Sequence, residues 1–189
     1  MFDTIKADLH RHLCCDARDS DSLVWKLFIL VFAYGFHAST VYRFGCFIDR
    51  RLRNGILYPL YLLANVLYCV CRFLTEKMYG ITIDRRAVIG PGLYIGHFGG
   101  IRIGCCRIGT NCNLHQQVTI GDRCVLGNYI WLGAHSVIEE GVALADHATV
   151  MVGARVASEV CSRCLASGNP ARIINKNYDN TRLLGLRDQ

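Results

Sequence analysis

Aliphatic residues recur every six positions over the second half of the chain, and this repeat restricts the fold more than any other feature of the sequence. A small residue usually follows each repeated position, and a second small or apolar residue lies two places before it. The repeated positions are Ile83, Ile89, Ile95, Ile108, Leu114, Ile120, Leu126, Leu132, Ile138, Leu144, Val150 and Val156. Such a repeat predicts short strands separated by turns and stacked as a parallel β-helix.

The repeat is interrupted between Ile95 and Ile108. The step between these two residues is thirteen, which is two repeats plus one residue, so the segment GHFGGIRIGCCR contains an insertion. His97 lies in this glycine-rich break. Because imidazole titrates near neutral pH, a histidine at the interruption is a candidate functional residue.

The eleven cysteines of the 189-residue chain indicate packing more than disulfide or metal chemistry. Cys106, Cys112 and Cys124 occupy the inward positions two residues before a repeated aliphatic residue, where a free cysteine behaves as a small apolar side chain. The first twenty residues carry charges throughout and no apolar run of a secretory signal, so we expect a cytosolic protein with reduced thiols. Cys161 and Cys164 form a lone C-x-x-C pair, a weak metal signal.

The first eighty residues lack the six-residue period and predict a helical domain over 1–80, before a β-helix domain over 81–175 and a tail over 176–189. Two apolar segments, 23–36 and 55–74, dominate the helical domain. The second has the length of a membrane-spanning helix, although Pro59, Asn65 and Arg72 disfavour a clean span.

Two interpretations of the apolar segments stay open. They pack on each other and on neighbouring subunits, or they lie at a membrane interface with the basic cluster DRRLRN attracted to anionic lipid. The net charge is +6, and its basic residues are scattered. This charge favours an anionic ligand or a membrane surface over nucleic acid.

Four segments carry a resemblance to a known family. They are FHASTVYRFGCFI (36–48), VIGPGLYIGHFGGIRIG (88–104), NLHQQVTIG (113–121) and SGNPARII (167–174). In this order and at compatible spacing they resemble the serine acetyltransferase branch of the hexapeptide-repeat acyltransferases. The resemblance implies an N-terminal helical domain, then a left-handed parallel β-helix with three repeats per coil. It also implies a homotrimer with acetyl-CoA bound between adjacent β-helices and no metal, and it leaves a dimer of trimers open.

The resemblance assigns the chemistry to histidine. His97 matches the family's general base, which takes the proton of the attacking hydroxyl and gives one to the departing CoA thiolate, a role that suits an imidazole of pKa about 6.5. Ile95 and Leu114 are nineteen residues apart, so His97 and His115 follow one face on successive coils. We expect His115 to be a second catalytic candidate, supporting the base or binding the acceptor, and His135 to lie at the surface. For His97 and His115, an ordinary turn or corner position is the alternative.

The resemblance also implies positions for acetyl-CoA. The assigned residues are Gly133, Ala134, Gly153, Asn169, Pro170, Arg172 and Lys176. Asn169 and Pro170 belong to SGNPAR, which resembles the segment along the pantetheine arm. Arg172 and Lys176 follow it and are expected near the CoA phosphates, although such residues after a last strand are commonly only solvated.

The sequence departs from the family around the acceptor. The family places one aspartate fifteen residues before the histidine to orient it and another directly before it to meet serine; here the two positions hold Thr82 and Gly96. The Arg-His pair that holds the serine carboxylate is also missing after VTIG. Because unpaired charges in a closed site are costly, these differences indicate another alcohol. Asp19 or Asp21 still matches an acidic position of the family, which keeps serine open.

The sequence therefore predicts an acetyl-CoA-dependent O-acetyltransferase acting on a sugar hydroxyl of an exopolysaccharide or its lipid-linked precursor. A histidine without the amino-acid clamp resembles the exopolysaccharide and capsule O-acetyltransferases of this branch, and we expect a cytoplasmic protein, with the inner face of the cytoplasmic membrane as an alternative location. Serine O-acetyltransferase of cysteine biosynthesis and a non-catalytic membrane-associated scaffold are the alternative functions.

Two further points concern the chemistry of the histidines. The group that orients His97 is open between Asp84, Glu76, Thr82 and a backbone carbonyl. A zinc enzyme of the γ-carbonic anhydrase type is disfavoured, because the position five residues after His115 is an isoleucine and not a second ligand.

Overall fold

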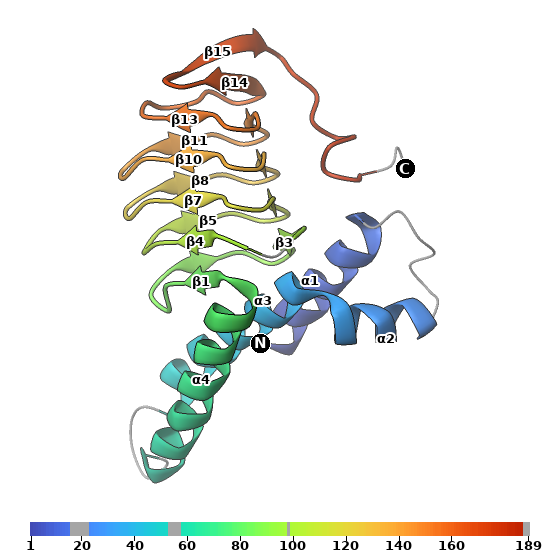
Figure 1. Cartoon of the computed structure of the whole chain (residues 1–189), viewed down its shortest axis with the longest axis vertical. Coiled ribbons are helices and arrows are strands. Elements are labelled where there is room, and N and C mark those ends of the chain that lie inside the picture. Colours follow the sequence, from blue (N-terminus) through green and yellow to red (C-terminus); the bar gives the residue numbers. More distant parts are fainter. Residues whose placement is uncertain (16–22, 53–57, 98, 187–189) are drawn as a thin grey trace.

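The computed structural model describes residues 1–15, 23–52, 58–97 and 99–186, which form helices followed by a parallel β-helix (Figure 1). The helices are α1 (Phe2–Cys15), α2 (Leu23–Phe32), α3 (Tyr34–Arg51) and α4 (Tyr58–Tyr79). The strands are β1 (Ile81–Ile83), β2 (Val88–Ile89), β3 (Tyr94–Ile95), β4 (Ile101–Ile103), β5 (Arg107–Ile108), β6 (Asn113–Leu114), β7 (Thr119–Ile120), β8 (Val125–Leu126), β9 (Trp131–Leu132), β10 (Val137–Ile138), β11 (Ala143–Leu144), β12 (Thr149–Val150), β13 (Arg155–Val156), β14 (Cys164–Gly168) and β15 (Ala171–Lys176).

The strands form three sheets that are the faces of one prism. From β1 to β13 every third strand joins the same sheet, and β14 and β15 extend the third one; the orders are β1-β4-β7-β10-β13, β11-β8-β5-β2 and β15-β14-β12-β9-β6-β3. In the regular part the partner of each residue lies eighteen positions away, as for Ile108 and Leu126 or Leu114 and Leu132. The repeated aliphatic residues all point inward and are buried. The predicted helices and parallel β-helix are therefore confirmed.

The interruption of the repeat is more complex than the single insertion that the spacing predicted. Ile95 pairs with Leu114, whereas Ile103 pairs with Ile120 in the next coil. The step from Ile95 to Ile103 is therefore eight residues, and the step from Ile103 to Ile108 is five. Two residues are added at the corner that holds His97, and one is removed at the following corner. The sequence shows only the net offset, because both changes fall between regular segments.

The cysteines of the prism interior behave as predicted. Cys106, Cys112 and Cys124 are buried in the core, and burial raises the pKa of the first two thiols to about 12, so all three stay protonated.

The expectation of reduced thiols is wrong for one pair of cysteines. A disulfide joins Cys161, in the turn before β14, to Cys164, the first residue of β14.

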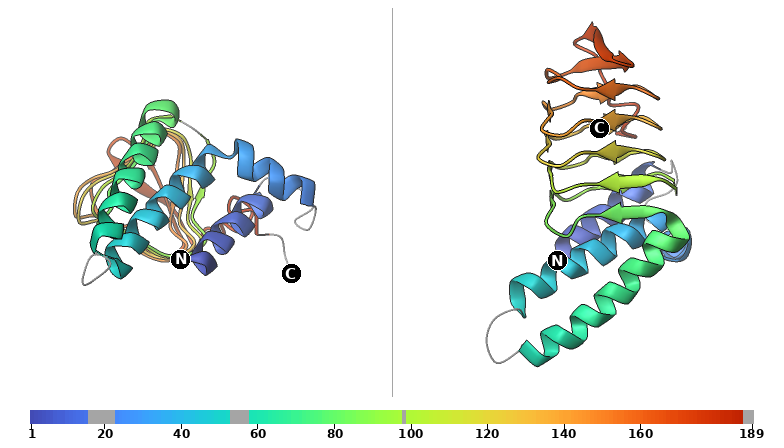
Figure 2. Two further views of the ribbon diagram at one scale, coloured as in Figure 1. Left: turned by 90° about the horizontal axis from the view of Figure 1, so that it is seen from below. Right: turned by 60° about the vertical axis from the view of Figure 1, so that its left-hand side comes forward.

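The helices cover one end of the prism (Figures 1 and 2), and α1 also reaches the outer face of the six-stranded sheet, where Arg11 donates a hydrogen bond to Asn113 of β6. The apolar segment 23–36 does not form one helix, since α2 ends at Phe32 and α3 begins at Tyr34 with a bend of 76° between them. Helices α3 and α4 pack closely, and a Cβ atom on Gly45 would lie 2.5 Å from the ring of Tyr68. By length and composition α4 is the one described helix able to cross a membrane, or one of two if the bent pair is a single span.

The C-terminal segment returns to the prism and the helical layer. Leu184 is fully buried, and the Asn180 side-chain amide donates hydrogen bonds to the carbonyls of Tyr129 and His147. Asn113 donates to the carbonyl of Leu183. Residues 176–186 of the predicted tail are therefore partly integrated into the structure.

A buried ion pair joins the helices to the first coil. Arg43 of α3 forms two hydrogen bonds with the carboxylate of Asp8 in α1, at 3.1 and 3.2 Å, and neither side chain is more than 7% exposed. The Asp8 carboxylate also accepts the backbone N–H groups of Gly92 and Leu93, both at 2.9 Å, and Arg43 donates to the carbonyl of Gly90. The charges are thus paired and hydrogen-bonded, which a buried ion pair requires.

Removing one partner of this pair should destabilise the fold strongly. We expect Asp8→Ala to lower the free energy of unfolding by about 3 to 5 kcal/mol, because Arg43 is left buried without its counter-charge. Urea unfolding followed by circular dichroism measures this change. The matched control is Glu139→Ala, which breaks the exposed pair with Arg155 and should cost less than about 1 kcal/mol. Equal losses in both variants would contradict the assignment.

Candidate active site

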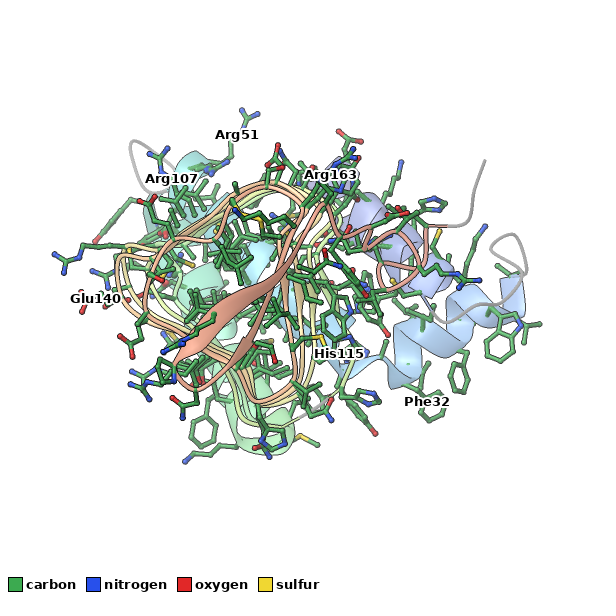
Figure 3. All side chains as sticks on the ribbon, turned by 90° about the horizontal axis from the view of Figure 1, so that it is seen from above. Phe32, Arg51, Arg107, His115, Glu140 and Arg163 are labelled. Carbon is green, nitrogen blue, oxygen red and sulfur yellow. A yellow bond between two sulfur atoms is a disulfide. The ribbon has the colours of Figure 1, made fainter. Side chains whose placement is uncertain are left out.

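The candidate site lies at the corner of the prism that follows the strands of the six-stranded sheet. Strands β3, β6, β9 and β12 of this sheet run parallel and stack on successive coils. Residues that follow these strands therefore form a column along one edge. His97 follows β3 and His115 follows β6, and Figure 3 shows His115 at the corner on the side of α2, which carries Phe32.

The two histidines meet as predicted. The ring centroids of His97 and His115 are 6.4 Å apart. His97 is exposed, whereas His115 is half-buried and lies 4.9 Å from the ring of Trp131. The backbone N–H of His115 donates to the carbonyl of Leu132, which holds its corner on the next coil. One edge thus presents an accessible imidazole supported by a more enclosed one.

Burial lowers the pKa of His115 below its ordinary value of about 6.5, and the charge of nearby His97 lowers it further. Both effects disfavour the imidazolium form, because that form loses hydration and would lie beside a second cation. At neutral pH His115 is therefore an uncharged ring. An uncharged neighbour adds no electrostatic penalty when His97 accepts a proton.

The carboxylates proposed to orient His97 are occupied elsewhere. Glu76 pairs with Arg72 at 2.7 Å, and Asp84 pairs with Arg86 at 2.8 Å. Thr82 lies in β1, where it pairs with Arg102 in the five-stranded sheet. Within the described residues, neither these side chains nor a backbone carbonyl forms a hydrogen bond with the His97 ring. The His97 ring instead contacts the ring of His115.

A cavity of about 230 Å³ opens beside His97, between β3 and the segment where α2 meets α3. Its walls include His97, Gly96, Tyr94, His12, Tyr34 and Phe32. The helices approach closely here, since a Cβ atom on Gly35 of α3 would lie 2.2 Å from the carbonyl oxygen of Ile95. Glycine at position 35 is therefore what allows α3 to form a wall of the cavity.

His12 and Tyr94 were not among the residues that the sequence singled out for the site. Their rings are 4.9 Å apart, and His12 is buried with Nδ1 2.8 Å from the carbonyl oxygen of Asp8. Tyr94 precedes the repeated residue Ile95, where its side chain points out of the prism. No sequence pattern pointed to His12 as a site residue, because only the docking of α1 brings it to the prism.

The acceptor positions give a mixed result. Gly96 lines the cavity, and a Cβ atom there would lie 3.0 Å from the Tyr94 ring, so Tyr94 occupies space beside this position. Asp19 and Asp21 lie outside the described residues. Among the described lining residues there is no aspartate, glutamate, lysine or arginine.

The positions predicted for acetyl-CoA lie mostly at the same edge. Gly133 and Ala134 follow β9, and the N–H of Gly153, after β12, donates to the carbonyl of Ala134 at 2.8 Å. Asn169 and Pro170 form the turn between β14 and β15, beyond the end of the same sheet. In the antiparallel β14–β15 pair, Arg172 lies opposite Ser167 near that turn, whereas Lys176 lies opposite Cys164 at the far end. All the positions predicted for acetyl-CoA except Lys176 therefore lie near this edge of the β-helix.

Comparison with known proteins points to one group. No protein-family model matches the chain. A serine acetyltransferase from Staphylococcus xylosus is 45% identical over 62 residues, which is 32% of this chain and 27% of that protein. The chain thus spans about a quarter of the curated relative that it matches.

Solved serine acetyltransferases share the fold. The enzyme from Vibrio cholerae superposes with a TM-score of 0.77 over 99% of this chain and 72% of its own, at 21% identity. The Neisseria gonorrhoeae enzyme in complex with serine has a TM-score of 0.76 at 21% identity, covering 92% and 69%. The soybean enzyme complexed with serine has a TM-score of 0.72 at 25% identity, covering 91% and 68%. The helical layer and the β-helix are therefore similar in these proteins.

The pKa of His115 should depend on its burial and on His97. We expect the His115 pKa, measured by NMR of the imidazole protons, to lie below about 6.5. His97→Gln should raise it, because the neighbouring cation is lost, but not to the ordinary value, because burial persists. His135→Gln, at an exposed corner, should leave it unchanged. A His115 pKa at or above the ordinary value would contradict the geometry.

Proposed function

We propose that this chain is an acetyl-CoA-dependent O-acetyltransferase of the serine acetyltransferase type, with His97 as its general base. The observation that carries the proposal is the pair of histidines at one corner of the β-helix, beside a cavity, in a fold shared with serine acetyltransferases. In this proposal the column of Gly133, Ala134 and Gly153 and the Asn169–Pro170 turn bind acetyl-CoA. The active form is a homotrimer, with the cofactor between adjacent subunits.

The chemistry follows from the accessibility of the His97 ring and the neutral form of the His115 ring. The acceptor hydroxyl donates its proton to His97 as its oxygen attacks the thioester carbon, and the tetrahedral intermediate then expels the CoA thiolate. The imidazolium returns the proton to the thiolate, so the products are an acetyl ester and free CoA. His97 is exposed and accessible for this step, while the neutral His115 packs against it without opposing its protonation.

L-serine is the acceptor that the similar proteins favour. The curated relative is a serine acetyltransferase, and the gonococcal and soybean structures contain serine. A sugar hydroxyl of an exopolysaccharide or its lipid-linked precursor is the second candidate. It is favoured by the cavity, whose described walls offer no charged clamp for an amino acid beyond the histidines. A neutral hydroxyl compound needs no such clamp.

Replacement of His97 should separate catalysis from binding. We expect His97→Ala to lower the rate of acetyl transfer about 10² to 10⁴-fold, because positioned proton transfer is lost. Its affinity for CoA, measured by calorimetry, should stay close to that of the unaltered protein. His135→Gln is the matched control and should keep full activity. Unchanged transfer in His97→Ala would remove the catalytic role of His97, and no CoA binding by either protein would favour a scaffold.

The acceptor can be identified by the release of free thiol from acetyl-CoA. We expect turnover with L-serine or with a panel of sugars and lipid-linked glycans, and the faster substrate class identifies the acceptor. Turnover of serine alone would exclude a sugar acceptor, and turnover of glycans alone would exclude serine. Release no faster than hydrolysis with every acceptor would contradict the proposed transferase.

A further inference from the structure

Helix α4 exposes a continuous apolar face. Its exposed apolar residues from Leu60 to Met78 fall within an arc of about 160° around the helix, at 100° per residue. Leu63, Val66, Val70 and Phe73 on this face are more than half exposed. The opposite face packs on α3, where Tyr68 is buried.

Helix α2 is apolar on nearly every side. Only Ile29 of its ten residues is buried, and its exposed side chains include Val24, Leu27, Leu30 and Val31. Phe32 of the same helix lines the cavity beside His97. Helices α2 and α4 lie toward opposite margins of the helical layer at one end of the prism (Figure 2). A soluble surface rarely leaves two helices with this many apolar side chains in water.

The charges around these helices are positive. Described residues 23–52 and 58–79 contain six basic and two acidic side chains. Both acidic side chains are paired, Asp49 with Arg85 and Glu76 with Arg72. Arg50 and Arg51, at the end of α3, are exposed. Of the six cations, Arg43 and Arg72 are paired with Asp8 and Glu76, which leaves Lys26, Arg50, Arg51 and Lys77 without an acidic partner among the described residues. An apolar face with such cations nearby matches an anionic lipid surface.

Aromatic residues with polar tips occur at the ends of these helices. Tyr58 and Tyr61 stack on each other at the start of α4, with ring centroids 5.7 Å apart. Trp25 lies in the first turns of α2 beside Lys26. Such residues favour the headgroup region, where the ring is in apolar surroundings and the polar atom stays hydrated.

We propose that α2 and α4 form a lipid-binding surface, which places the cavity beside His97 at an anionic bilayer. The helices lie on the bilayer and do not cross it, because the inner face of α4 packs on α3 through Tyr68 and β1 starts two residues after α4 ends. A second copy of the chain is a less suitable occupant, since a symmetric pair would bring the same cations together. Only the interpretation of the cavity as an active site rests on the proposed function. Lipid binding is measured independently of acetyl transfer.

The test is co-sedimentation of the full chain with vesicles. We expect binding to equimolar phosphatidylcholine and phosphatidylglycerol, weaker binding to phosphatidylcholine alone, and release as the salt concentration rises. The double variants Leu63→Ser/Val70→Ser in α4 and Leu27→Ser/Val31→Ser in α2 should each weaken binding at least about tenfold, because apolar area no longer enters the lipid.

Two controls keep lipid binding separate from folding and catalysis. Val125→Ser removes an equally exposed apolar side chain from β8 and should bind vesicles like the unaltered chain. His97→Ala should also bind normally, so a failed transferase and a failed lipid surface give different results. Circular dichroism confirms that each variant is folded.

Three results would overturn the proposal. One is a folded chain that binds neither vesicle preparation, and another is binding that survives both helix double variants. The third combines two observations: the unaltered chain does not bind vesicles, and the helix variants have a lower molar mass by light scattering. This result would assign the apolar faces to contacts between subunits.

Discussion

The stacking of parallel coils at a fixed period is the constraint on which the rest of the structure depends. Each strand pairs with the strand one coil away, so the residues after β3, β6, β9 and β12 fall in one column. The aliphatic residues inside the prism hold this register, because a shift would expose them. A histidine at one corner and a histidine one coil later therefore become neighbours although they are eighteen residues apart in sequence.

The site arises where that regularity is modified. Two extra residues enlarge the corner of His97, and one residue fewer at the next corner restores the register. The helical layer then closes one side of the corner, anchored by the buried pair of Asp8 and Arg43 on the first coil. Close approach at Gly35 allows α3 to form a wall of the cavity. The site therefore needs both the length of its local loops and the docking of helices that are distant in sequence.

The electrostatics of the site depend on contacts that the six-residue repeat does not predict. Asp84 and Glu76 lie thirteen and twenty-one residues before His97, and their arginine partners engage them, so neither orients its ring. His115 is kept neutral by its burial and by His97. His12 reaches the cavity only because α1 docks beside Tyr94. Position in the sequence was a poor guide here, because ion pairs depend on side-chain direction.

The sequence alone determined the repeat, the inward cysteines and the meeting of His97 with His115, since all three follow from a period that each coil enforces. It also predicted the helical first part from the loss of that period. Only the tertiary structure decided how the extra residues divide between two corners, that arginines engage Glu76 and Asp84 away from the His97 ring, and which helices wall the cavity. These depend on contacts between segments without a shared period, and no local pattern encodes such contacts.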